Sequence, residues 1–222
     1  MAGIAFMRRI SYRFGLFAAL MCAVPFFAGW ADTMEEIGDQ AAGIRAVKAR
    51  FVQEKHLEML DNPLISKGEL YFRAPDSLRW EYTDPVKSIL VMNRDRIRQY
   101  AMGEDGMQAR AGRDLEAMRF FLEQVGQWIQ GGFDKNPAFA AELQKDRRIV
   151  LTPVDKNISA VIEKIELRLT DTPGVIESAF IYEDETSYTR IVFHDTRINP
   201  KIADSVFERP LRGPADKSLA PG

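Results

Sequence analysis

Residues 68–91 read GELYFRAPDSLRWEYTDPVKSILV, and large apolar residues alternate in them with charged ones. This period of two is typical of a β-strand with one buried face. Proline follows Ala74 and again Asp84, and because proline cannot continue a ladder, each position would end a strand. The stretch therefore predicts three short strands. The apolar residues that need a cover are Leu70, Phe72, Leu78, Trp80, Tyr82, Ile89 and Val91.

The period-two pattern continues on both sides of this stretch. Turn residues such as Asp61-Asn62-Pro63 separate the runs, and connections this short place successive strands antiparallel. Strands are expected near residues 51–59, 64–72, 77–83, 87–93, 96–101, 148–152, 160–169, 175–182 and 188–193.

Two segments have the spacing of amphipathic helices instead. A capping-box pattern at Thr33 begins the first, which would run to about residue 48. The second would cover residues 115–129 with a wide aromatic stripe and end at Gly131-Gly132. Residues 198–207 are expected to cover one edge of the sheet. These elements predict an α+β fold: a single curved antiparallel sheet with helices on its concave side.

The first 31 residues have the features of a secretory signal. A basic start precedes an apolar run that is too short for a membrane span, and small residues lead up to Ala31. We expect an exported protein that is cleaved near Ala31, a single domain over residues 32–212 and a disordered tail over 213–222. The single cysteine, Cys22, lies in the signal, so the mature protein would contain no disulfide.

Charge and motif spacing argue against several classes of function. The signal contains three of the 30 basic residues and none of the 32 acidic ones, so the remainder carries a net charge of about −5, which argues against nucleic acid as a partner. His56 and His194 lack any spacing typical of metal ligands. No nucleophile elbow, phosphate loop or dinucleotide fingerprint is present. The sequence predicts no catalytic residue, metal site or cofactor.

The positive signal is an excess of apolar residues on faces that would meet. Together with the apolar face of residues 68–91, they would form either an ordinary hydrophobic core or the wall of a cavity for an apolar ligand. Residue types alone favour the core. The additional candidates are Phe121, Val125 and Trp128 in the second helix, and Ile165, Leu167, Ile191 and Phe193 in the later strands.

The block from Gly68 to Val91 resembles the outer-membrane lipoprotein carrier family, the LolA-like proteins. The shared pattern is Gly-acidic-Leu-aromatic-aromatic-basic-x-Pro, then Leu-x-Trp-x-aromatic, then Pro and Ser-Ile-Leu-Val. Weaker matches at residues 51–53, 150–153 and 199–210 extend the resemblance over most of the mature chain. It implies an unclosed half β-barrel, with helices as a lid over an apolar cavity that the candidate residues would line.

The resemblance also implies a function and a set of partners. Carriers of this family take acylated lipoproteins from an ATP-driven transporter in the inner membrane, cross the periplasm and pass them to an outer-membrane receptor, without covalent chemistry. Leu78 matches a rim position that contacts the transporter. We therefore expect a monomeric periplasmic carrier that is not an enzyme.

One position departs from the family pattern. Family members have Arg before the proline that ends the Leu70 strand, where it helps to hold the lid shut. This chain has Ala74 there, and Arg73 would point to the opposite face. Two other functions stay open: a lipid- or lipoprotein-sensing module of the same fold that signals to a protein partner, and an exported lipid esterase.

Overall fold

The computed structural model describes residues 33–104, 106–110, 115–172 and 174–208. Eleven strands form one antiparallel sheet in the order β6-β5-β4-β3-β2-β1-β11-β10-β9-β8-β7. The elements are α1 (Met34–Ala41), β1 (Ala46–His56), β2 (Leu64–Arg73), β3 (Ser77–Asp84), β4 (Ser88–Asn93), β5 (Arg96–Gly103), β6 (Gly106–Arg110), α2 (Leu115–Ile129), β7 (Phe139–Gln144), β8 (Arg148–Pro153), α3 (Lys156–Ser159), β9 (Lys164–Leu169), β10 (Ile176–Tyr182), β11 (Tyr188–Ile198) and the 3-10 helix η1 (Asp204–Phe207).

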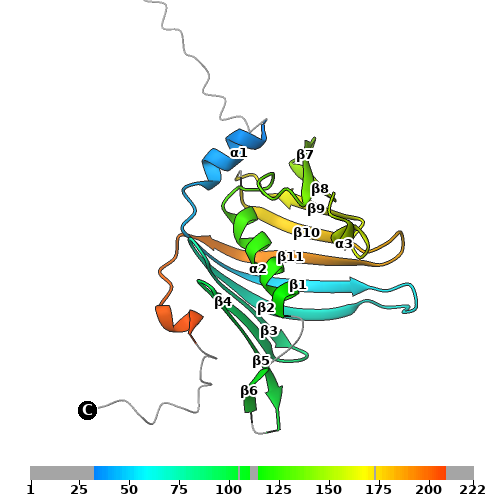
Figure 1. The fold of residues 1–222 in the computed structure, drawn as a ribbon. Helices are drawn as coiled ribbons and strands as arrows, with labels where there is room; N and C mark the ends of the chain where they lie inside the picture. The colour runs from blue at the N-terminus through cyan, green and yellow to red at the C-terminus, as the bar shows by residue number, and fades with distance from the viewer. Residues whose placement is uncertain (1–32, 105, 111–114, 173, 209–222) are drawn as a thin grey trace, which may run out of the picture.

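The sheet is curved and not closed, because β6 and β7 form its two edges. Figure 1 shows α2 lying across the hollow of the sheet and α1 near one end of it. A register shift between Lys48 and Arg50 in β1, and a positive φ of 52° at Asp195 in β11, mark irregularities of the kind that bend strands. This architecture confirms the predicted α+β fold with an open antiparallel sheet.

Each face of the sheet carries its own apolar cluster. The large concave cluster joins α1 and α2 to the strands, with Phe72 and Trp80 from the sheet and Trp128 from α2 among its members. The convex cluster is small and lies beneath η1. It consists of Tyr71, Ile89, Val91 and Phe207, with partly buried residues around them. The strands β2 to β4 are therefore covered on both faces.

Some element boundaries differ from the sequence-based expectation. The first helix ends at Ala41, not near residue 48, because Val47 and Phe51 join β1 at strand spacing and pair with β2 and β11. The sequence pattern does not predict β6 and β7, whose short edge sequences alternate weakly. The strand expected from residue 160 begins at Lys164, after the short helix α3.

The C-terminal segment also lies elsewhere than expected. Residues 198–207 do not cover an edge of the sheet: η1 packs on the convex face of β3 and β4, because buried Phe207 fits among apolar side chains there. The predicted signal (1–31) and tail (213–222) lie outside the described residues. Within the described part of the chain, no helix is long and apolar enough to span a membrane.

Candidate functional site

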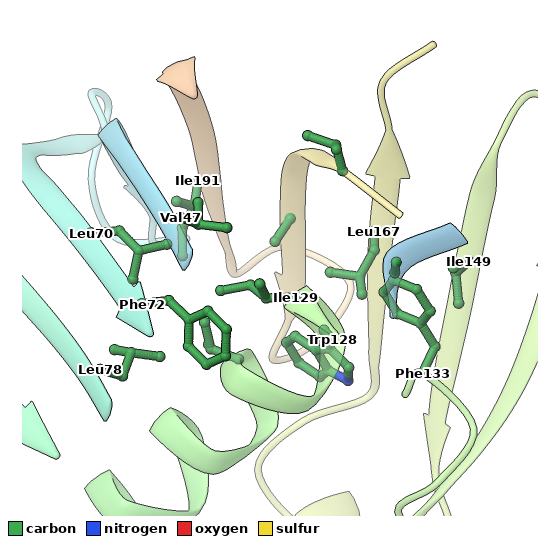
Figure 2. Packing of buried hydrophobic residues seen from close by; sticks show 14 of the residues in the cluster. Val47, Leu70, Phe72, Leu78, Trp128, Ile129, Phe133, Ile149, Leu167 and Ile191 are labelled. Carbon is green, nitrogen blue, oxygen red and sulfur yellow. The ribbon is translucent and has the colours of Figure 1, made fainter. Parts of the chain in front are cut away.

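The candidate site is the apolar layer between the concave face and α2. All the candidate residues from the sequence except Ile89 and Val91 lie in this layer, and most of them are buried. Figure 2 shows Trp128 and Ile129 of α2 between Phe72 and Leu78 on one wing of the sheet and Leu167 on the other. One helix face therefore joins two groups of strands that are far apart in the sheet order.

An aromatic group occupies the middle of this layer. The ring of Trp80 lies 4.5 Å from Phe51, 5.3 Å from Phe121 and 6.2 Å from Phe193, measured between centroids. Phe51 fits because its partner in β2 is Gly68: a Cβ there would lie 2.4 Å from the Phe51 ring and 2.0 Å from the Glu81 carbonyl oxygen. The first residue of the stretch that predicted the fold thus makes room for the aromatic group.

Tyr82 adds one polar group to the edge of the aromatic group. Its hydroxyl donates a hydrogen bond to Gln53 Oε1 at 2.9 Å, and its ring packs edge-on against Phe51. Burial raises the pKa of Tyr82 above its ordinary value. The hydroxyl therefore stays neutral at physiological pH and leaves the concave layer uncharged at this point.

Ile89 and Val91 do not belong to this layer, which corrects the sequence-based grouping. In the β3–β4 register, Val91 pairs with Arg79 and Ile89 pairs with Glu81, so both apolar residues share the convex face with these charged ones. The register pairs Trp80 with Leu90 and Leu78 with Met92, so the even-numbered residues of both strands face inward and the odd-numbered ones face outward. The inward-facing residues of β4 are Leu90 and Met92, which the sequence analysis did not single out.

A narrow apolar crevice of about 30 Å³ opens where α2 meets the sheet near α1. Of its walls, the sequence predicts Leu70, Val125 and Phe193; the others come from loops and from the ends of strands and of α2. Its lining residues are Ile44, Val47, Ala49, Leu70, Val125, Ile129, Gly174, Val175, Ile176, Phe193, Thr196 and Ile198. A larger hollow of about 650 Å³ beside η1 is lined mainly by charged side chains, which do not suit an apolar ligand.

Two hydrogen bonds, one from α2 and one from the residue that follows it, reach turns of the sheet. Arg119 donates to the carbonyl oxygen of Asp95 at 3.1 Å, and Gln130 donates weakly to that of Pro75 at 3.5 Å. Arg73 points to the convex face, as its position predicts, and pairs there with Asp204. The contact to the Pro75 turn therefore comes from the helix and not from an arginine of the strand.

Small residues fix the C-terminal end of α2. Gly131 follows the helix with a φ of +77° and approaches α1 so closely that a Cβ would lie 2.8 Å from that of Ala41. Gly174 in the β9–β10 turn meets the same Ala41 from the other side. The C-terminal end of α2 is therefore held in close contact with α1 and the β9–β10 turn.

The histidines occupy structural positions. His56 stacks on Tyr188, with ring centroids 4.3 Å apart, at one end of the sheet. His194 is exposed on the convex face, so the two rings do not form a common site. Among the described residues, no group of His, Cys, Asp or Glu side chains is arranged to hold a metal ion.

Comparison with known sequences identifies the family of this chain. The sequence model of the family described as "Outer membrane lipoprotein carrier protein LolA" matches residues 42–210. The chain belongs to the LolA family. The proteins of the LolA family are carriers and not enzymes, which agrees with the expectation from the sequence.

The individual LolA-family relatives are distant. The chain is 20% identical over 192 residues to an outer-membrane lipoprotein carrier protein of Pseudoalteromonas translucida, covering 85% of this chain and 86% of the relative. It is 24% identical over 168 residues to one from Alkalilimnicola ehrlichii, covering 73% and 75%. A solved LolA superfamily protein from Nitrosomonas europaea has 11% identity and a TM-score of 0.41, covering 81% of this chain and 99% of that protein.

Proposed function

We propose that this protein is a periplasmic carrier that holds the acyl chains of lipoproteins between the concave face of its sheet and α2. The observation that supports this most directly is the apolar layer itself. α2 covers a wide apolar surface, and Arg119 of α2 and Gln130 just after it each donate one hydrogen bond to a turn of the sheet. Apolar contacts are not directional, so an acyl chain can replace those of α2 with little loss.

The size of the crevice indicates that α2 must move for binding. Ligand pockets have volumes of about 300–1,000 Å³, whereas the apolar crevice measures about 30 Å³. A chain of about sixteen carbons could gain on the order of 10 kcal/mol on burial, before ordering costs. Because α2 competes for the same surface, much of that gain is offset, and the cargo stays releasable.

The route of transport completes the proposal. The carrier would accept acylated lipoproteins from an ATP-driven transporter of the inner membrane and deliver them to a receptor at the outer membrane. Export by the predicted signal would place it in the periplasm, where it would act as a monomer. The lining would consist of the concave candidate residues together with Leu90, Met92 and the walls of the crevice.

Binding of a fluorescent palmitoylated peptide to the purified protein tests this proposal. Phe193→Ser removes a half-buried ring from the concave layer and should weaken binding about ten-fold, as expected for losing roughly 1.4 kcal/mol of apolar contact. Val192→Ser changes the neighbouring half-buried residue, which faces the convex side, and should leave binding unchanged. Equal affinities for both variants would contradict the proposal.

A transfer assay separates carrier from sensor. A carrier should release the palmitoylated peptide to acceptor vesicles or to a receptor, whereas a sensing module should retain it and bind a regulatory protein. The esterase alternative predicts turnover of ester substrates, which should then fall in His194→Ala. No feature of the described residues favours that reaction over binding.

A further inference from the structure

Exposed apolar side chains gather at one end of the sheet. The strand register places four connections and the end of β5 at this end, which we call the hairpin end: residues 57–63, 85–87, 154–163 and 183–187, and Glu104. The large exposed apolar residues at or beside these connections are Met59, Leu60, Leu64, Ile65, Val86, Met102, Val154 and Val161. Figure 1 shows the β1–β2 hairpin and the β10–β11 loop projecting on the same side.

The degree of exposure at this end is unusual for apolar side chains. Met59 is 87% exposed, Val86 67% and Val161 63%, and the three come from separate turns. Single exposed apolar residues are common on protein surfaces, but a set concentrated at one end indicates an interaction surface. Met59, Val86 and Val161 are exposed at turns and line none of the described pockets, so they suit insertion into a partner better than reception of a ligand.

The opposite end of the sheet has a different character. Its turns carry exposed charged residues such as Arg45, Arg94, Asp95, Lys145 and Asp146. Ile198 is the large exposed apolar side chain among the described residues at that end. The two ends of one sheet are thus chemically distinct, although the strands that connect them are the same.

We propose that the hairpin end inserts its apolar tips into the surface of a lipid bilayer. The tips lie on separate connections spread from β5 to β9, so they do not form one compact patch for a protein pocket. A bilayer accepts separate side chains along a line, and the charged residues beside the tips can stay at the level of the headgroups. Each tip adds a small apolar area, which gives weak and reversible binding.

The charged residues at the hairpin end determine whether anionic or zwitterionic lipids are preferred. Glu58 and Asp61 lie in the β1–β2 connection, and Glu183, Asp184 and Glu185 lie in the β10–β11 loop, where Glu183 pairs with Lys55 at 2.9 Å. Acidic residues outnumber lysines in these connections. Anionic lipids would repel them, so zwitterionic membranes are the preferred surface.

Vesicles of phosphatidylcholine provide the test. The emission of Met59→Trp and Val86→Trp should shift to the blue when these vesicles are added, and brominated phosphatidylcholine should quench it. Lys145→Trp, on an exposed turn of the opposite end, is the matched control and should show neither effect. Equal parts of phosphatidylglycerol and phosphatidylcholine should weaken binding at low salt. Absence of a shift at Met59 and Val86, or an equal shift at Lys145, would overturn the proposal.

A second variant keeps this test separate from acyl binding. The triple change Met59→Ser, Val86→Ser and Val161→Ser should reduce co-sedimentation with phosphatidylcholine vesicles at least ten-fold and leave binding of the palmitoylated peptide intact. Phe193→Ser should have the reverse pattern. If the triple variant binds vesicles as strongly as the parent, the proposed membrane contact is wrong. That result would not bear on the proposed acyl site.

Discussion

The two faces of strands β2 to β4 are covered in opposite ways. On the concave face, α2 lies on a wide apolar surface. On the convex face, the C-terminal segment buries the one ring of Phe207 and is fastened by polar side chains of the sheet. The donors Arg73, Arg79, Asn93 and Arg98 bond to the carbonyl oxygens of Ile202, Val206, Phe207 and Glu208 at 3.4, 3.2, 3.4 and 2.7 Å.

This difference indicates which cover can move. Hydrogen bonds to carbonyl oxygens are directional, and the side chain of Arg79, which also pairs with Glu81, is fully buried under η1. Lifting η1 would break the hydrogen bond from Arg79 to the Val206 carbonyl oxygen, together with those from Arg73, Asn93 and Arg98, each worth about 0.5–1.5 kcal/mol. Lifting α2 exposes apolar surface that an acyl chain can cover instead. We therefore expect the convex cover to stay in place, whereas α2 on the concave face is the proposed lid.

The largest expected effect comes from truncating one buried ring on each face. Phe72→Ala and Phe207→Ala should each lower the free energy of unfolding by about 3–5 kcal/mol, because both rings are fully buried. Only Phe72→Ala leaves its void beneath α2, where an acyl chain can fill it. Chemical denaturation measures the loss of stability in both variants. Titration with palmitoylated peptide should show tighter binding for Phe72→Ala alone. Tighter binding by Phe207→Ala would mean that the two faces are coupled.

A smaller effect is expected from the polar contacts of the lid. Arg119→Ala combined with Gln130→Ala removes the two hydrogen bonds from α2 to the turns, each worth about 0.5–1.5 kcal/mol. Together they amount to about 1–3 kcal/mol, so the double variant should bind palmitoylated peptide at least about five-fold more tightly, because the closed state loses stability. Arg73→Ala is the matched control, since its guanidinium fastens η1 on the other face. A comparable gain in Arg73→Ala would restore a lid-fastening role to Arg73.

The sequence predicts the concave face more completely than the convex one. Strand alternation identifies Leu78, Trp80 and Leu167 because each lies within a regular run of period two. It fails for Ile89 and Val91, because alternation within each run does not reveal the register between strands: Trp80 pairs with Leu90, so the even-numbered residues of β4 face inward. The position of the C-terminal segment on the convex face is not predicted for another reason. Its hydrogen bonds are accepted by backbone carbonyl oxygens, which every residue possesses. The crevice is missed because its walls come from irregular ends that meet only in three dimensions.

The smallest expected effects concern the ionisation of two tyrosines, one on each face of the sheet. Burial raises the pKa of Tyr71 on the convex face, helped by its hydrogen bond to Glu69, and burial raises that of Tyr82 on the concave face. A raised folded-state pKa gives stability that is complete below the unfolded value of about 10 and is lost as pH rises through the folded value. Tyr71→Phe and Tyr82→Phe should each reduce that alkaline loss of stability.

Cargo should then distinguish the two tyrosines. An acyl chain beneath α2 removes water from around the half-buried Tyr82, so its pKa should rise further when palmitoylated peptide is bound. Tyr71 lies on the far side of the sheet beneath the fixed cover, and its ionisation should not change. Ultraviolet titration of the parent and of each Phe variant, with and without peptide, gives the ionisation of the removed tyrosine as the difference between the two curves. A shift at Tyr71 on loading would show that the convex cover moves with the lid, and the division of roles between the faces would fail.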